Sequence, residues 1–182
     1  MIIRKSFKGE CAHIVRNCFT KRCSENIHGH SFIVEVFLET DKLDNGFMAV
    51  DFGLLKPTLG KFVDLFDHTY MLWSEEKEEF KDFIKSNCSR WVELPVSPSA
   101  EALSIMFLYM FNVMLDALLR KKLNNGESKY LTVKAVRYHE TTTGYAEATQ
   151  QDLDMLPQDC FVNSILFSPE LEEDLGKEII GI

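Results

Sequence analysis

The segment 28–40, HGHSFIVEVFLET, predicts a strand with one buried face and one wet face. Its later even positions are all apolar: Phe32, Val34, Val36 and Leu38. Polar residues such as Ser31 and Glu35 stand between them. Because successive side chains of a strand point to opposite faces, this two-residue period places the apolar set on one side. A shorter strand over residues 2–10 is expected to precede it.

A first helix is predicted over residues 54–66, after a turn at 44–46. Its apolar positions fall on one stripe: Leu55, Leu59, Phe62, Val63 and Phe66. A stripe of this spacing is typical of a helix that packs one face against a core. Pro57 is compatible with this helix only in the first turn, where its missing N–H is not needed.

A second, longer helix is predicted to begin in the segment 97–101, SPSAE. Ser97 suits the N-cap, Pro98 the first helical position, and Glu101 the positive end of the helix dipole. Its buried face is expected at Leu103, Phe107, Met110, Met114 and Leu118. The segment 124–126, NNG, is expected to end the helix.

Residues 130–140 and 144–149 read as a final hairpin, so the element order is strand, strand, helix, helix, strand, strand. This order predicts an α+β fold, an antiparallel sheet with the helices on one face. We expect one domain over residues 1–182. Two segments lie outside this plan, an insertion at about 73–97 and an acidic C-terminal extension at about 150–182. Each is compatible with a surface helix or an oligomer contact.

Composition places the chain among ordinary globular proteins, with 46% hydrophobic and 26% charged residues. We expect no membrane-spanning segment, and the N-terminal MIIRKSFKGE lacks the apolar stretch of a signal peptide, so a cytoplasmic location is expected. Charge limits the kinds of partner that the chain can bind. A net charge of -8 argues against broad nucleic-acid binding. Residues 1–30 nevertheless hold six basic and two acidic side chains, which suits a small anionic ligand. The five cysteines show no paired spacing and are expected to be free thiols.

His28 and His30 are the strongest candidates for chemistry, because side chains two apart on a strand share a face. They lie on the same face as the apolar stripe, so the two imidazoles border the predicted core. The simpler interpretation is two histidines satisfied by backbone hydrogen bonds. The alternative is a metal site with His13 as third ligand, which leaves one tetrahedral position open for catalysis. With Cys23 as fourth ligand the site would instead be closed and structural.

Six blocks of sequence resemble one family in their order. They are AH at 12–13, C…HGHSF at 23–32, VDFGLLK at 50–56, DHTYML at 67–72, PSAE at 98–101 and HETTTGY at 139–145. Together they are similar to the 6-pyruvoyltetrahydropterin synthase and 6-carboxytetrahydropterin synthase family, most of all to its bacterial carboxy-forming branch. The resemblance covers most of residues 2–149.

The resemblance implies a tunnelling fold, a four-stranded antiparallel sheet carrying two helices. It also implies a ring-shaped homo-oligomer, commonly a hexamer of two stacked trimers, with active sites at subunit boundaries. Its implied ligands for Zn²⁺ are His13, His28 and His30. Its implied substrate is a pterin triphosphate, 7,8-dihydroneopterin triphosphate.

The remaining roles also follow from matched motifs. Cys23 would be the catalytic thiol, with Asp67 and His68 as its acid/base partners. Glu140 would anchor the pterin ring, whose 2-amino and N3–H groups offer two parallel donors to a carboxylate. Glu101 could bind the same edge, although its place in the dipole of a helix already explains it. Alternatively, Asp67 and His68 only mark the end of a helix, where a histidine is favourable because of the helix dipole.

The function implied is a carbon–carbon lyase of queuosine biosynthesis that forms 6-carboxy-5,6,7,8-tetrahydropterin and releases acetaldehyde and triphosphate. Two relatives within the family stay open, a 6-pyruvoyltetrahydropterin synthase and a folate-branch enzyme that forms a 6-hydroxymethyl pterin. The folate branch uses a glutamate near the thiol, and this chain has Glu25 beside Cys23. Outside enzymes, the alternative is a non-catalytic oligomer stabilised by zinc.

Overall fold

Four antiparallel strands form the part of the sheet that the sequence predicted. The computed structural model describes residues 1–122, 130–156, 161 and 164–175. The four strands are β1 (Ile2–His13), β2 (His28–Thr40), β5 (Leu131–His139) and β6 (Tyr145–Thr149). They lie in the order β6-β5-β2-β1, and each neighbouring pair is antiparallel. The predicted strand at 28–40 and the final hairpin are therefore confirmed, while β1 extends three residues beyond its predicted end.

Three further strands extend the sheet beyond β1, so the predicted four-stranded antiparallel sheet was wrong. They are β3 (Thr69–Trp73), β4 (Trp91–Leu94) and β7 (Leu166–Phe167). β3 runs parallel to β1 and β4 parallel to β3, which makes a mixed sheet of seven strands. The physical reason is burial: the first four residues of β3 are all buried, so this strand reads as a continuous apolar run without alternation.

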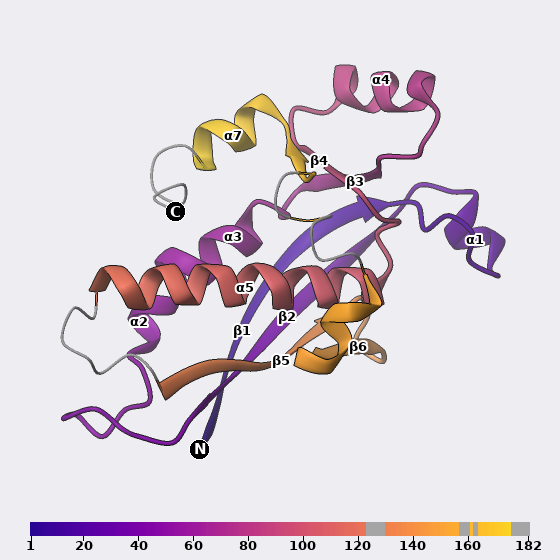
Figure 1. The fold of residues 1–182 in the computed structure, drawn as a ribbon. Coiled ribbons are helices and arrows are strands. Elements are labelled where there is room, and N and C mark those ends of the chain that lie inside the picture. Colours follow the sequence, from indigo (N-terminus) through magenta and orange to yellow (C-terminus); the bar gives the residue numbers. More distant parts are fainter. Residues whose placement is uncertain (123–129, 157–160, 162–163, 176–182) are drawn as a thin grey trace.

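One face of the sheet is covered by helical segments and holds the main core (Figure 1). The predicted helix at 54–66 is α2 (Phe52–Leu55), a π-helical stretch (Lys56–Gly60) and α3 (Lys61–Asp64) in succession. The expected stripe is confirmed, since each of its members is at most 1% exposed: Leu55, Leu59, Phe62, Val63 and Phe66. Pro57 lies near the start of the π-helical stretch. Phe62 and Phe66 pack edge-on against Phe107 of the long helix.

That long helix, α5 (Ala100–Lys122), lies across the same face. Its cap differs from the prediction, because Ser99 Oγ accepts the amide of Ala102 at 3.2 Å. Ser97, two residues earlier, has a buried hydroxyl without a partner among the described residues. Leu103, Phe107 and Met114 are buried as expected and Met110 is half-buried; the Leu118 side chain and residues 124–126 lie outside the described residues.

The expectation about membrane spans needs a correction at α5. The window Ala100–Ala117 has a mean hydropathy of 1.3 and is long enough to cross a membrane. Half of this window is buried inside the protein, where it packs against the sheet. Core packing therefore accounts for its apolar composition.

A fourth helix covers the opposite face of the sheet, so the helices do not all lie on one side. α4 (Glu78–Asn87) joins β3 to β4 and contributes Ile84 to a small core with Tyr70 and Leu72 of β3. Met71, which alternates with those two residues, points into the main core. The segment 73–97 is thus a helix and a strand built onto the edge of the sheet.

The C-terminal extension also packs against the sheet. It forms a 3₁₀ helix (Gln150–Met155), then β7 beside β4, then α7 (Pro169–Leu175). Leu171 and Leu175 of α7 are buried in the main core. This extension therefore contributes to the core, and Cys160 within it lies outside the described residues.

Candidate active site

Three histidines converge where β1 and β2 end together. The strand register pairs His13 with His28 and Cys11 with His30, so the three imidazoles share the core face of the sheet. Their ring centroids lie 4.7–5.0 Å apart. One ligand atom from each ring lies within 4.8 Å of the other two. Cys23 does not belong to this cluster of ligand atoms in the part of the chain that the structure describes, which favours an open three-histidine site over a closed one.

Backbone carbonyls fix the tautomers of two of these rings. His13 Nδ1 lies 2.9 Å from the carbonyl oxygen of Pro98, and His28 Nδ1 lies 3.0 Å from that of Asn26. A carbonyl oxygen only accepts, so each Nδ1 carries the proton and each Nε2 keeps a free lone pair. Metal-binding histidines are commonly oriented in this way.

The Nε2 atoms are the unusual feature of the cluster. Those of His13 and His30 are buried and have no hydrogen-bond partner among the described residues. Burial, followed by repulsion from His28 and His30, lowers the pKa of His13 to about 4, and burial likewise lowers the pKa of His30. Neutral rings with unpartnered, converging nitrogens fit a divalent metal such as zinc, and they do not fit the simpler interpretation in which backbone bonds satisfy both rings.

Glu140 borders this cluster from the end of β5. Its Oε1 lies 3.4 Å from His13 Nε2 and 3.6 Å from His30 Nε2. It follows Tyr138 by two residues on the core face, whereas His139 points the other way and contacts Glu35 at 2.9 Å. The structure therefore brings the Glu140 carboxylate to two of the three imidazoles, those of His13 and His30.

Cys23 lies in a single helical turn, α1 (Lys21–Ser24), just before β2. Its carbonyl accepts the amide of Val15 at 3.0 Å, which ties this turn to the end of β1. Burial raises the pKa of the Cys23 thiol, and Cys18 and Glu140 raise it further. The backbone bond to Val15 places the Cys23 turn next to the end of β1, two residues beyond His13. With its raised pKa, this thiol keeps its proton at neutral pH in the isolated chain.

Asp67 and His68 form a fixed pair between α3 and β3. Asp67 Oδ1 accepts the amide of Glu10 at 2.7 Å, and Asp67 Oδ2 lies 3.0 Å from His68 Nδ1. The amide of His68 donates to the Glu10 carbonyl at 2.6 Å. Burial alone would raise the pKa of Asp67, but the Glu10 amide and His68 outweigh it and hold that pKa below its usual range.

α3 stops at Asp64, and three successive i→i+3 hydrogen bonds carry the chain on to Asp67, so that His68 follows directly after a helical end. Its φ of 54° is in the left-handed region, which is uncommon for a residue other than glycine. Such a conformation persists only where the surroundings enforce it, here through both backbone groups of Glu10. A left-handed residue directly after a helix is also a common way for a helix to end, in agreement with the helix-end explanation of this pair.

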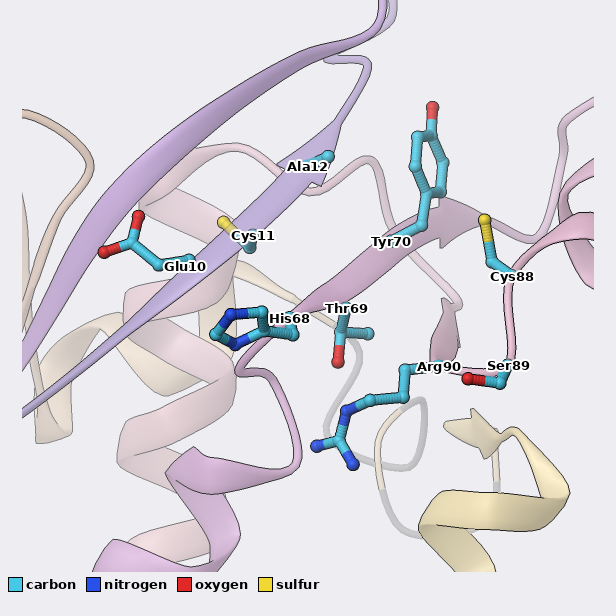
Figure 2. A pocket seen from close by; sticks show the side chains of 9 residues that line it. All are labelled: Glu10, Cys11, Ala12, His68, Thr69, Tyr70, Cys88, Ser89 and Arg90. Atoms are coloured by element: carbon cyan, nitrogen blue, oxygen red, sulfur yellow. The ribbon is translucent and has the colours of Figure 1, made fainter.

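The His68 imidazole lines a pocket of about 490 Å³ between β1, β3 and the start of β4. Figure 2 shows the His68 ring close to β1. Glu10, Tyr70 and Arg90 line the same pocket. Glu10 and Ala12 alternate with Cys11 and His13 along β1, so this pocket opens on the face opposite the three histidines. Among the described residues, no hydrogen bond or ion pair joins Asp67 or His68 to Cys23 or to the histidine cluster. One chain thus holds two separate groups of candidate residues.

Glu101 lies on the exposed side of the first turn of α5. The helix start itself borders the histidines through the Pro98 carbonyl. Pro98 and Asn26 act through backbone oxygens, which no side-chain pattern reveals. Sequence reasoning therefore missed both.

Comparisons with known proteins agree with these features. A family model described as 6-pyruvoyl tetrahydropterin synthase matches residues 2–151. A 6-carboxy-5,6,7,8-tetrahydropterin synthase of Helicobacter pylori strain J99 is 44% identical over 154 residues, which cover 85% of this chain and 75% of the relative. The synthase of the same name from Aquifex aeolicus is 32% identical over 133 residues, covering 69% and 75%.

Solved structures support the fold. An uncharacterized protein of Wolinella succinogenes has a TM-score of 0.59 at 18% identity and covers 82% of this chain and 98% of its own. The 6-pyruvoyl tetrahydropterin synthase of Plasmodium falciparum has a TM-score of 0.56 at 18% identity, covering 81% and 96%. At 18% sequence identity, these two structures support the fold only.

Proposed function

The chain belongs to the 6-pyruvoyl tetrahydropterin synthase family, and from this premise we propose that it converts 7,8-dihydroneopterin triphosphate to 6-carboxy-5,6,7,8-tetrahydropterin. The reaction releases acetaldehyde and triphosphate and would serve queuosine biosynthesis. The observation that carries this proposal is the 44% identity to a synthase of that name. The histidine cluster, with its unpartnered nitrogens, supports it.

In this proposal His13, His28 and His30 hold Zn²⁺. When bound, the ion would acidify the vicinal hydroxyls of the substrate side chain and stabilise negative charge on their oxygens. Glu140 accepts hydrogen bonds from the 2-amino and N3–H donors of the pterin ring. Glu101 is an auxiliary candidate for that edge at the exposed start of α5.

Cys23, Asp67 and His68 are the proposed proton-transfer groups. Cys23 holds a proton at its sulfur, and Asp67 orients the His68 imidazole through Nδ1, which leaves Nε2 to exchange a proton with substrate. Because the Asp-His pair faces away from the histidines of its own chain, a second copy of the chain would have to supply it. This requirement supports a homo-oligomer, and the resemblance favours a hexamer of two trimers.

Complementation between subunits tests this arrangement. We expect His68→Ala and Cys23→Ala proteins to be inactive alone. Mixed in equal amounts and reassembled, they should recover about a quarter of wild-type activity, because a quarter of the interface sites then draw both intact residues from different subunits. No recovery in verified mixed oligomers would place both residues in one subunit.

Product analysis tests the function itself. The purified protein is incubated with 7,8-dihydroneopterin triphosphate, and the products are weighed by mass spectrometry. A 6-carboxy pterin with acetaldehyde is the expected result. A 6-pyruvoyl or 6-hydroxymethyl product would instead support one of the two related activities, and no turnover would refute the proposal.

Glu25 is the residue that keeps the hydroxymethyl branch open. The Glu25 side chain is exposed and lies 3.6 Å from Lys21 on α1, one helical turn away. Its carboxylate therefore pairs along the surface of α1.

Cobalt substitution tests the non-catalytic alternative, in which Cys23 is the fourth metal ligand. A Cys23 ligand would give a thiolate charge-transfer band that three imidazoles do not give.

The proposal extends to the organisation of the chain. Residues 1–182 form one pterin-synthase domain with an insertion at about 73–97 and an extension at about 150–182. The expected location is the cytoplasm.

A further inference from the structure

We propose that the insertion at about 73–97, which lies between the motif blocks of the resemblance, positions both groups of proton-transfer residues through two arginine contacts. The inference rests on the proposed function of Cys23, Asp67 and His68. The segment 74–95, which we call the brace, contains α4 and β4 and lies between the Cys23 turn and the Asp67–His68 pair. One contact reaches Cys23 through Arg16 and Glu76; the other reaches Asp67 through Arg90.

The first contact holds the turn that carries Cys23. Arg16 binds Glu76 of the brace with two hydrogen bonds, Nε to Oε1 at 2.6 Å and Nη2 to Oε2 at 3.0 Å. Its remaining Nη1 donates to the carbonyl of Ser24 at 2.8 Å, next to Cys23 in the chain. The Glu76 side chain is 7% exposed and the Arg16 side chain 30%, so this paired geometry is largely shielded from water.

The second contact holds the turn that carries Asp67 and His68. Arg90 donates from Nε to the carbonyl of Asp67 at 3.0 Å and from Nη2 to that of Asp64 at 3.1 Å. These carbonyls lie at and just beyond the end of α3, where helical partners are missing. Nη1 contacts Glu170 of α7 at 3.2 Å, so the C-terminal extension fixes the guanidinium from behind.

Buried polar contacts join the parts of the brace to one another. Lys81 of α4 is buried and donates to the carbonyl of Ser74 at 3.0 Å. Glu93 of β4, also buried, lies 3.5 Å from Lys81 Nζ and 2.6 Å from Lys85 Nζ. These pairs fasten α4 onto β4 between the two arginine contacts.

A positioning role follows from what each arginine touches. Three of their donors bind backbone carbonyls within one residue of Cys23 or within the turn that ends in His68. Arg16 and Arg90 each direct three donors at protein oxygens, and Arg90 also lines the pocket beside His68. The Arg90 contacts add to the Glu10 contacts that hold His68 in its left-handed backbone conformation.

Glu76→Gln tests the first contact, with Glu79→Gln as matched control. Glu79 lies three residues away in the same segment and is exposed. We expect Glu76→Gln to lower kcat about tenfold with KM changed less than about twofold and zinc content unchanged. We also expect the rate of Cys23 alkylation by iodoacetamide to change severalfold. Peptide mass spectrometry resolves Cys23 from Cys11, because trypsin cuts after Lys8, Arg16 and Arg22, and the buried Cys11 reports general unfolding.

Arg90→Lys tests the second contact, with Arg137→Lys as control, because Arg137 lies on β5, three strands away from β3 in the sheet. Lysine keeps the charge but cannot bind two carbonyls and Glu170 together. We expect kcat to fall about tenfold and the rate of His68 modification by diethylpyrocarbonate to change, while Cys23 alkylation stays at the wild-type rate. Glu76→Gln should instead change the rate of Cys23 alkylation and leave the rate of His68 modification at the wild-type value.

Wild-type-like kcat and labelling rates in both variants would overturn the inference. So would variants that lower only the melting temperature and leave kcat per folded molecule and labelling unchanged. A wild-type protein without turnover would refute the proposed function, and the two labelling rates would still decide whether the brace positions these residues.

Discussion

Gly29 separates two of the proposed metal ligands, and replacing it with alanine should disturb the histidine cluster in a measurable way. A Cβ built on Gly29 would lie 2.9 Å from the carbonyl oxygen of Cys11 on β1. That separation is well inside normal contact distance, and the obstructing atom is backbone in a paired strand. The two strands would have to move apart exactly where they carry His13, His28 and His30.

The size of the effect follows from overpacking, which costs about 1–3 kcal/mol in a well-packed region. For a chain of this length, each kcal/mol lowers the melting temperature by about 2–4 °C. A shift between the strands also moves His28 and His30 relative to His13, so we expect zinc affinity to fall about tenfold, as with other changes that misorient ligands.

The assay is a thermal melt of metal-free protein together with competition titration of zinc against a chromophoric chelator. Gly144→Ala is the matched control, because a Cβ there meets only Thr141 Oγ1 at an ordinary 3.6 Å. If Gly29→Ala melts like wild type, the close contact is not constraining. If it melts lower yet binds zinc equally well, the link between strand spacing and ligand placement is wrong.

Three further results are expected. His28→Ala should lose zinc, whereas Cys23→Ala should keep zinc and lose activity; metal analysis that finds both variants fully loaded would contradict this assignment. Glu140→Gln should raise KM for the substrate by about tenfold with zinc retained, and an unchanged KM would remove Glu140 from pterin binding. Asp67 has a lowered pKa in the folded state, so its stabilising effect is present at neutral pH and is lost as pH falls below about 4. The difference in unfolding free energy between wild type and Asp67→Asn should therefore shrink in acid, and a constant difference would refute the pairing.

Local patterns were enough to predict the elements whose two faces differ. The alternation from Phe32 to Leu38 and the stripe from Leu55 to Phe66 both correspond to one buried side, and the structure confirms them. The same parity argument placed His28 and His30 on one face. Periodicity could not detect β3, because a strand buried on both faces has no polar residues to alternate with.

The separation of the two candidate groups depends on a pairing that sequence motifs do not encode. Asp67 and His68 occur in a motif of the same family as the histidines, which invites placing them in one pocket. Their position is decided by β3 joining β1 in parallel from Cys11 onward and by the Glu10 backbone, which holds His68 in a left-handed conformation. Because Glu10 and His13 point to opposite faces of β1, motif order alone cannot bring His68 to the metal ligands. Under the proposed function, one of the two groups would come from another copy of the chain. Arg90 and Glu76 would then each hold one of the two groups in place at the contact between copies.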